Sequence, residues 1–364
     1  MKWKHPVALV VFLAILLAIT LMGSIPVFAD SPTRAVALIF HHVSEETPAV
    51  TSISPVAFEE ILDLLTGDPS YSVLPLATVV DSLQRGGLLP PRSVTLTFDD
   101  GYESVYSEAF PRLKRHGFPF TVFICPSAID ARTGPVMTWD QLREMADAGA
   151  TIANHSSSHV HLQRRRIGES APEWKTRIRR DLLDAERRIT EELGSAPGWL
   201  AFPYGEYDIA VLELVDELGW AGFGQQSGPM GTDSDFRILP RFPIGGKFTD
   251  KRDLALKLAT VPFPLRESVP VSPLVGAGTD IPVLRLNLGP GDYQADQVAA
   301  FASGQGPADV FWVDKEAGIL EVRARQPLSL GRNRYNITIP SRGREYWYWY
   351  SQLWIVGDEH ETGR

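Results

Sequence analysis

The sequence predicts an α/β protein: an incomplete or distorted (β/α) barrel of about seven strands, followed by a small all-β, sandwich-like domain. Two observations predict this fold class. Between residues 35 and 260, short apolar runs alternate with stretches of helical periodicity, as in repeated βα units. Beyond this range the helical pattern largely ends, and apolar residues alternate with polar ones. Periodicity alone does not distinguish an open sheet from a barrel, but this number of βα units favours an incomplete barrel.

The first expected strand is the continuous apolar run from Ala35 to Phe40, which suits a strand covered on both faces. A helix should begin at Pro55, because Ser54 can cap it and apolar residues form one stripe before Gly67. Further strands are expected near residues 93–98, 120–125, 150–153, 199–202, 221–224 and 237–241.

Two more helices follow from capping and periodicity. Thr138 can cap a helix that ends at Gly149. The longest helix is expected over residues 172–193, where the apolar residues fall on one side and indicate core packing. The arginines at 177–188 alternate with acidic residues, so we interpret them as a solvated charged face.

The second part of the chain should be all β. Prolines stiffen the segment between the two parts, and alternating strands are expected at 283–288, 319–325, 335–339 and 346–355. The run Tyr346–Tyr350 is aromatic on both faces; core packing is the main expectation, and stacking on sugar rings is the alternative. The predicted divisions of the chain are an N-terminal segment 1–29, a main domain 30–262, a Pro-rich linker 263–274 and a β domain 275–364.

The N-terminal segment predicts export. Lys2 and Lys4 precede an apolar run, and Val27-Phe28-Ala29 offers small residues at the positions that a signal peptidase recognises. The apolar run is also nearly long enough to span a bilayer, so an uncleaved anchor is the alternative to a cleaved signal peptide. In either case we expect a periplasmic or extracellular protein, or one anchored to the outer face of the cytoplasmic membrane, with membrane contact through this segment only.

Composition excludes some functions. The formal net charge of −9 and the pI of about 5.4 argue against a nucleic-acid partner, which requires a clustered basic surface. Cys125 is the only cysteine, so no intramolecular disulfide can form. Because it ends an apolar run, Cys125 is expected to be a small buried hydrophobe rather than a nucleophile.

Two acids and two histidines suggest a metal site. Asp99 and Asp100 close the predicted strand 93–98, and His155 and His159 follow in the sequence NHSSSH. The acids should therefore lie at the C-terminal edge of the sheet, where α/β enzymes place their chemistry. If the histidine segment turns helically, the spacing of four directs both imidazoles the same way. Surface histidines and an Asx-capped turn are the structural alternatives, but two adjacent carboxylates at the end of a buried strand repel each other.

The residue types indicate a catalytic metal site. Two histidines and one carboxylate leave open coordination positions for water and substrate, and mixed nitrogen and oxygen ligands suit Zn²⁺ best, with Co²⁺ or Ni²⁺ as alternatives. The second acid then stays free to act as a base.

Three motifs, in order, resemble those of the polysaccharide deacetylase family, also called NodB-like or carbohydrate esterase family four. They are Thr97-Phe98-Asp99-Asp100-Gly101-Tyr102, His155-Ser156-Ser157-Ser158-His159 and Phe202-Pro203-Tyr204-Gly205. The resemblance covers roughly residues 35–260. It implies that Asp99 is the general base, that Asp100, His155 and His159 bind the metal, and that the backbone N–H of Tyr204 stabilises the oxyanion.

The chain departs from the family pattern in two places. It has no late Leu-x-His motif to supply the general acid, but its Phe-His-His-Val run resembles the exported, circularly permuted branch that deacetylates poly-β-1,6-N-acetylglucosamine. We therefore predict His41 as the general acid, with His42 as the alternative. Ala201 replaces an arginine that the family usually has, and Arg241 is our candidate to orient Asp99, with a surface salt bridge as the alternative.

The substrate is expected to be an acetylated amino-sugar polysaccharide. Trp139, Pro203 and Tyr204 are candidates for contact with it, with core packing as the alternative for the aromatic pair. The leading hypothesis is a metal-dependent N-deacetylase of an N-acetylglucosamine polymer. One alternative is a glycan-binding protein with weak or no catalysis, and another is a deacetylase of peptidoglycan or another acetylated envelope glycan.

Overall fold

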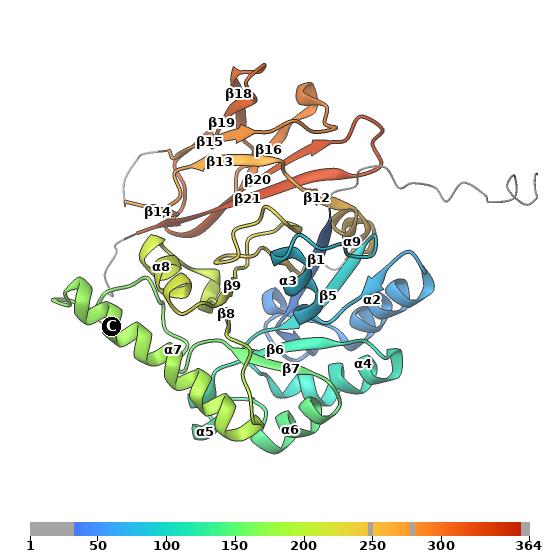
Figure 1. Cartoon of the computed structure of the whole chain (residues 1–364), viewed down its shortest axis with the longest axis vertical. Helices are drawn as coiled ribbons and strands as arrows, with labels where there is room; N and C mark the ends of the chain where they lie inside the picture. Colours follow the sequence, from blue (N-terminus) through green and yellow to red (C-terminus); the bar gives the residue numbers. More distant parts are fainter. Residues whose placement is uncertain (1–32, 247–249, 277–280, 358–364) are drawn as a thin grey trace, which may run out of the picture. The chain divides into compact units, whose positions relative to one another are not determined.

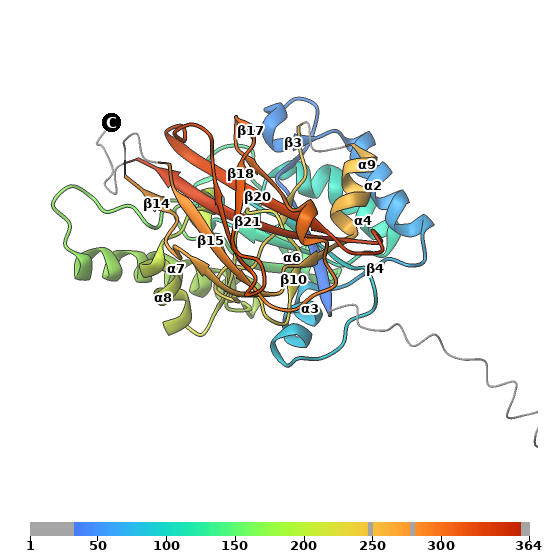
Figure 2. The same ribbon diagram turned by 90° about the horizontal axis from the view of Figure 1, so that it is seen from above.

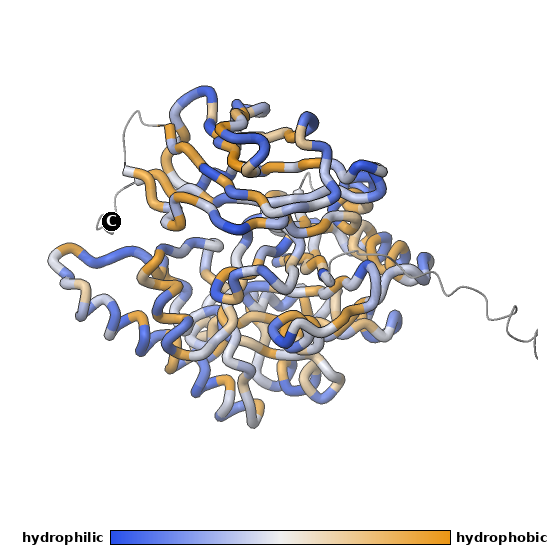
Figure 3. Tube along the Cα trace, turned by 45° about the horizontal axis from the view of Figure 1, so that its top comes forward, coloured by the Kyte–Doolittle hydropathy of each residue, from blue (hydrophilic) through white to orange (hydrophobic). Residues whose placement is uncertain are grey.

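The computed structural model describes residues 33–246, 250–276 and 281–357. The predicted signal peptide or anchor, residues 1–29, lies outside this range. No helix in the described part of the chain combines the length and apolar character needed to cross a bilayer. In Figure 3, hydrophilic and hydrophobic stretches alternate along the trace of the described residues.

The main sheet is a curled half-barrel, which confirms the predicted incomplete barrel (Figure 1). Seven strands follow one another across it: β10 (Met230–Gly231), β1 (Arg34–Phe40), β5 (Ser93–Phe98), β6 (Phe120–Ile124), β7 (Thr151–Asn154), β8 (Trp199–Ala201) and β9 (Ala221–Phe223). Neighbours from β1 to β9 run parallel, whereas β10 is antiparallel to β1. Two short strands, β4 (Ser72–Val73) and β11 (Phe242–Pro243), pair with β5 and β1.

The described helices of this part are α2 (Pro55–Gly67), α3 (Leu76–Gln84), α4 (Phe110–His116), α5 (Pro126–Ala131), α6 (Trp139–Asp147), α7 (Ala171–Leu193), α8 (Ile209–Glu217) and α9 (Lys251–Leu258). The expected caps are present: the side chain of Ser54 accepts from the N–H of Ala57, and Thr138 forms a capping box with Gln141. Two further strands, β2 (His42–Val43) and β3 (Ser52–Ile53), form a small parallel pair.

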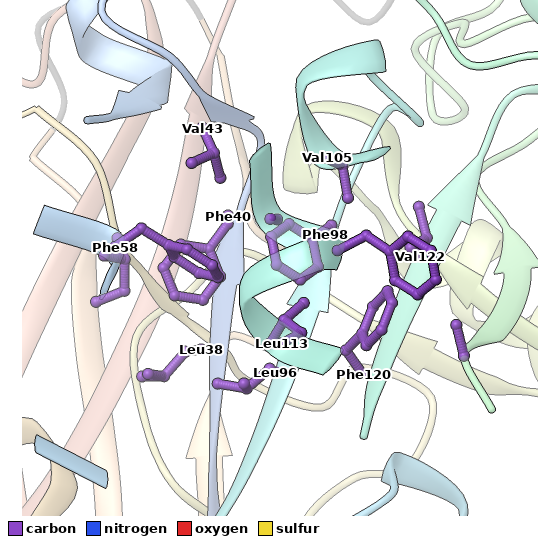
Figure 4. Close-up of a cluster of buried hydrophobic side chains, with 14 of the residues drawn as sticks. Leu38, Phe40, Val43, Phe58, Leu96, Phe98, Val105, Leu113, Phe120 and Val122 are labelled. Atoms are coloured by element: carbon purple, nitrogen blue, oxygen red, sulfur yellow. The ribbon is translucent and has the colours of Figure 1, made fainter. Parts of the chain in front are cut away.

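The core between the sheet and the outer helices explains why these elements form. Residues Ala35 to Phe40 of β1 are all buried, as their continuous apolar run predicts, and all six residues of β5 are buried as well. Helix α2 places Phe58 against this sheet, where its ring lies 5.2 Å from that of Phe40 in an edge-on contact, and Phe40 stacks on Phe98 (Figure 4). The predicted apolar stripe of α7 is buried as well, from Trp174 to Ile189.

The C-terminal part consists of two β sheets, as predicted. The six-stranded sheet contains β12 (Thr260–Pro262), β14 (Leu274–Val275), β16 (Ala299–Ala302), β17 (Gly306–Pro307), β20 (Gly331–Pro340) and β21 (Trp347–Val356). The four-stranded sheet contains β13 (Leu265–Val269), β15 (Val283–Leu288), β18 (Asp309–Asp314) and β19 (Ile319–Arg323). Both sheets contribute to one apolar cluster. Figure 2 shows β20 and β21 running side by side as long antiparallel strands.

Three details of the predicted elements can be compared with the structure. The strand expected at 237–241 is wrong: only an isolated bridge joins Leu239 to Phe223, and Pro240 lacks the N–H that a ladder requires. The segment 263–274 contains β13, which pairs with β15. The aromatic strand is core, because Tyr348 packs in the C-terminal cluster and Trp349 contacts Phe242 of the main domain.

Candidate metal-dependent active site

The C-terminal ends of four parallel strands meet at one edge of the main sheet. Strands β1 and β5 end in register at Phe40 and Phe98, and the N–H of Asp99 donates to the carbonyl of Phe40. Likewise, the N–H of His155 donates to the carbonyl of Ile124 at the end of β6. The residues that follow these strands are therefore neighbours in space, although they are far apart in the sequence.

Asp100, His155 and His159 converge on one point. Oδ1 of Asp100 lies 3.1 Å from Nε2 of His155 and 3.1 Å from Nε2 of His159. The side chain of His155 is buried, whereas those of Asp100 and His159 are partly exposed. This is the predicted set of two imidazoles and one carboxylate, and it is consistent with a divalent metal site that is open on the solvent side.

His155 provides the test of whether a metal ion fits this set. Its Nδ1 is hydrogen-bonded to the carbonyl of Ala201 at 2.8 Å, so the proton must sit on Nδ1 and Nε2 carries the lone pair. That Nε2 is buried, and among the described residues it has no hydrogen-bond partner. A buried ring nitrogen aimed at a carboxylate oxygen without a hydrogen bond fits a metal ligand. Burial lowers the pKa of His155, but the adjacent Asp99 and Asp100 outweigh this effect and raise it overall, so a metal ion would compete with a proton for Nε2.

A second cluster of one histidine and two acids has no imidazole nitrogen without a partner. Glu59 and Asp63 on α2 lie near His116 at the end of α4. Both ring nitrogens of His116 have partners, since Nδ1 contacts the hydroxyl of Thr66 and Nε2 contacts Glu59, each at 2.8 Å. Glu59 also pairs with Arg115. A positively charged neighbour and a fully bonded imidazole favour an ion-pair network over a metal site here.

The loop that carries the histidines is not helical. Ser156 and His159 have positive φ angles of 61° and 52°, so the loop coils back on itself. The N–H of His159 donates to Oγ of Ser156 at 2.9 Å, and the N–H of Ser156 donates to Oδ1 of Asn154 at 2.8 Å. These local bonds, rather than a helical turn, direct both imidazoles toward Asp100.

Helix α7 holds the histidine loop from outside, which we did not predict. Asp181 accepts from the N–H of Ser157 at 3.0 Å and from the hydroxyl of Ser158. The amide of Asn154 donates to Glu186 at 3.0 Å, on the same helix. These contacts could have been suspected from the sequence. Asp181 and Glu186 lie beside the apolar stripe of the helix, where an acidic side chain faces the protein rather than solvent. The arginines of the same segment pair with acids, as expected of a charged face.

Asp99 forms a two-point ion pair with Arg241. NH1 and NH2 of Arg241 donate to Oδ1 and Oδ2 of Asp99 at 2.7 and 2.8 Å, and neither side chain is exposed to solvent. The predicted alternative, a surface salt bridge, is therefore wrong. Burial raises the pKa of Asp99, but Arg241, His155 and His41 together outweigh this effect, so the pKa is lowered. Nε of Arg241 also donates to the carbonyl of Gly224, which fixes the guanidinium.

The two candidate acid histidines face different environments. His41 is close enough to Asp99 and Asp100 for their charges to raise its pKa, although burial is stronger and lowers it overall. His42 is buried, and its ring stacks on that of Tyr102 with centroids 3.6 Å apart. The structure thus brings His41 to the charged groups of the site, and its role as the acid stays a prediction.

The candidate substrate contacts lie in two places. Tyr204 has a φ of 61°, and its ring lies 4.6 Å from that of His159. Pro203 is buried beside it. Trp139 on α6 instead donates to Asp130 and lies under the guanidinium of Arg188. Among the described residues, Trp139 has no hydrogen bond or ring contact with His155 or His159, so its predicted contact with substrate stays a prediction.

Comparison with known proteins relates this site to one family. Residues 87–223 match the family model described as polysaccharide deacetylase, a range that includes the converging acids and histidines but not His41 or Arg241. The poly-beta-1,6-N-acetyl-D-glucosamine N-deacetylase of Escherichia coli K12 is 25% identical over 261 residues, which is 62% of this chain and 38% of that protein. The enzyme of the same name from Staphylococcus aureus MRSA252 is 25% identical over 166 residues, 44% of this chain and 57% of that protein.

Solved structures show the same fold. The Streptococcus pyogenes deacetylase PplD superposes with a TM-score of 0.56 at 20% identity, covering 63% of this chain and 99% of that one. IcaB from Ammonifex degensii superposes with a TM-score of 0.53 at 22% identity, covering 62% of this chain and 97% of that one.

Proposed function

Because this chain is related to the polysaccharide deacetylases through residues 87–223, we propose that it is a metal-dependent hydrolase that removes N-acetyl groups from an N-acetylglucosamine-containing polysaccharide. The observation that carries the proposal is the convergence of Asp100, His155 and His159 beside a separate, buried Asp99 that is paired with Arg241. A ligand set with an unligated base next to it is what amide hydrolysis by water requires.

Each residue has a distinct part in the proposed reaction. Asp100, His155 and His159 would hold a divalent ion, with zinc as the best match, and that ion would supply an acidic water and positive charge at the scissile carbonyl. Asp99 accepts the proton of the attacking water. The backbone N–H of Tyr204, a residue in the left-handed region, would stabilise the oxyanion.

The departing amine needs a proton, and His41 donates it. The reaction then balances: one water is consumed, the amide bond breaks, and acetate and a free amino sugar are released. Burial lowers the pKa of His41, which makes its protonated form a stronger acid toward the amine. The carboxylates of Asp99 and Asp100 oppose this effect and help to retain the proton.

The proposed substrate is a β-1,6-linked N-acetylglucosamine polymer outside the cytoplasm. Two relatives carry the name of such a deacetylase, and the N-terminal residues Lys2 and Lys4 with their apolar run favour export. Peptidoglycan or another acetylated envelope glycan is the alternative, because the site residues define the reaction centre and not the sugar subsites. The complete ligand set and base disfavour a protein that only binds glycan.

The test is acetate release from a panel of β-1,6-linked N-acetylglucosamine oligomers, chitooligosaccharides and peptidoglycan fragments. We expect release from at least one of them, loss after treatment with a chelator, and recovery when Zn²⁺ is added. Mass spectrometry of the products identifies the polymer. Failure of the folded, zinc-loaded protein to release acetate from every member of the panel would disprove the proposal.

A further inference from the structure

The turn that carries Tyr204, residues 202–206, is tightly constrained. The N–H of Gly205 donates to the carbonyl of Phe202 at 2.8 Å, and the N–H of Glu206 donates to that of Pro203 at 3.1 Å. Gly205 itself has a φ of 66°, and a Cβ at that position would lie 2.7 Å from Cβ of Gln225. No side chain fits there, so the path of this turn depends on glycine.

Two side chains of the histidine loop hold the turn from one side. Glu206 is almost fully buried, and its Oε2 accepts from Nδ1 of His161 and from Nε2 of Gln163, each at 2.6 Å. The ring of His161 stacks on that of Tyr204 with centroids 4.1 Å apart and planes 14° from parallel. The same tyrosine ring meets the edge of His159, so the turn and the metal-site loop are packed as one unit.

The opposite side of the turn is held by the C-terminal β sheets. Arg332 lies on β20, 128 residues from Tyr204, and its NH1 donates to the backbone carbonyl of Tyr204 at 2.5 Å. Its guanidinium also lies 5.8 Å from the centre of the Tyr204 ring, and its Nε is 3.7 Å from Oε1 of Glu206. One cation thus contacts the main chain, the ring and the acid of the same turn.

From these contacts we propose that Arg332 is a positioning residue, through which the C-terminal β domain fixes the Tyr204 turn for catalysis. The inference rests on the proposed deacetylase function and extends it, because it gives the β domain a part in the reaction centre. The physical reason is geometric. The backbone N–H of Tyr204 keeps its direction only if the carbonyl of the same residue is also fixed. Misplacement of a group that positions the reacting atoms by about 1 Å can lower the rate on the order of a hundredfold.

The test compares Arg332→Ala and Arg332→Lys with a matched control, Arg325→Ala, in the full-length protein. Arg325 is also an exposed arginine of the β domain, and it pairs with Asp309 rather than with the main domain. For Arg332→Ala we expect kcat to fall by roughly ten- to a hundredfold with KM and Zn²⁺ affinity little changed. The lysine variant should recover part of the loss, and the control should match the wild type.

Hydrogen exchange supplies a readout that does not depend on activity. In Arg332→Ala the amides of Gly205 and Glu206 should exchange faster than in the wild type, because the turn loses its bond to β20. Unchanged exchange together with unchanged kcat would overturn the inference, and so would faster exchange with full activity. A change in KM alone would mean that Arg332 contacts the substrate instead, which also overturns it. If the wild type releases no acetate, the proposed function fails. The exchange experiment still tests whether Arg332 fixes the Tyr204 turn.

Discussion

Asp99 and Asp100 are neighbours in the chain, but their carboxylates face different partners. Both oxygens of Asp99 accept from Arg241, whereas Oδ1 of Asp100 lies 3.1 Å from the two histidine nitrogens. The backbone turns between them because Asp100 has a φ of 71°. Burial raises the pKa of Asp100, but the adjacent His155 and His159 lower it overall, so both acids are held ionised. One carboxylate can therefore bind a metal while its neighbour remains a base.

The first prediction separates these two tasks. Asp100→Asn should abolish zinc binding and acetate release together, because a ligand is lost. Asp99→Asn should still bind zinc but lower kcat by roughly 10²- to 10⁴-fold, the usual contribution of a general base. Zinc content and acetate release, measured on the same samples, check both outcomes. Loss of zinc in an Asp99→Asn protein that is still folded, as judged by circular dichroism, would contradict the division of roles.

The second prediction concerns the partner of the base. Arg241→Met leaves Asp99 buried without a cation, so the free energy of unfolding should fall by about 3–5 kcal/mol. Removal of the guanidinium leaves burial, which raises the pKa of Asp99, opposed only by His155 and His41, so the pKa rises. The acid limb of the kcat/KM profile should therefore move to higher pH. Denaturation curves and pH profiles measure the two effects.

Arg237→Met is the control for this experiment, since Arg237 lies in the same segment and pairs with Asp235 in a partly exposed bridge. We expect it to change unfolding by less than about 1 kcal/mol. If both variants behave alike, the buried pair has no special part in the site.

The third prediction tests the contacts from α7 to the histidine loop. Asp181→Ala removes the acceptor for Ser157 and Ser158, so the imidazoles lose part of their orientation. Zinc affinity should fall by roughly ten- to a hundredfold, as is typical when a residue that supports a metal ligand is removed. Isothermal titration calorimetry measures it. Asp184→Ala, on the same helix but paired with the exposed Arg187, should keep the wild-type affinity, and an equal loss in both would refute the prediction.

Much of the fold and part of the site could be predicted because the signals are local. The continuous apolar run of β1 and the helical periodicity of α7 each determine an element by themselves. Parallel strands share one C-terminal edge, so acids after β5 and histidines after β7 had to lie near each other. Their convergence required no knowledge of tertiary contacts.

The remaining features depend on contacts that the local sequence does not specify. Arg241 was the predicted partner of Asp99, but the sequence could not exclude a surface salt bridge. The two residues, 142 positions apart, meet because β11 pairs with β1 and the backbone N–H of Arg241 bonds to Gln226. The spacing of His155 and His159 suggested a helical turn, but spacing alone does not reveal the positive φ angles of Ser156 and His159 that give the loop its non-helical path. The contact from Arg332 depends on how β20 packs, and a lone arginine in an alternating strand gives no indication of its partner.

The last prediction uses the pH dependence of stability. The guanidinium of Arg177 holds Glu169 through two bonds and lowers its pKa from 4.5 to about 2. A lowered pKa means that this stabilisation is present above pH 4.5 and is lost as the pH falls toward 2. Glu169→Gln should therefore be less stable than the wild type near neutral pH, and the difference in unfolding free energy should shrink as the pH approaches 2. Urea denaturation at a series of pH values measures it, with Asp184→Asn as a control at a more exposed pair. A difference that stays constant across this range would show that the ion pair does not stabilise the fold.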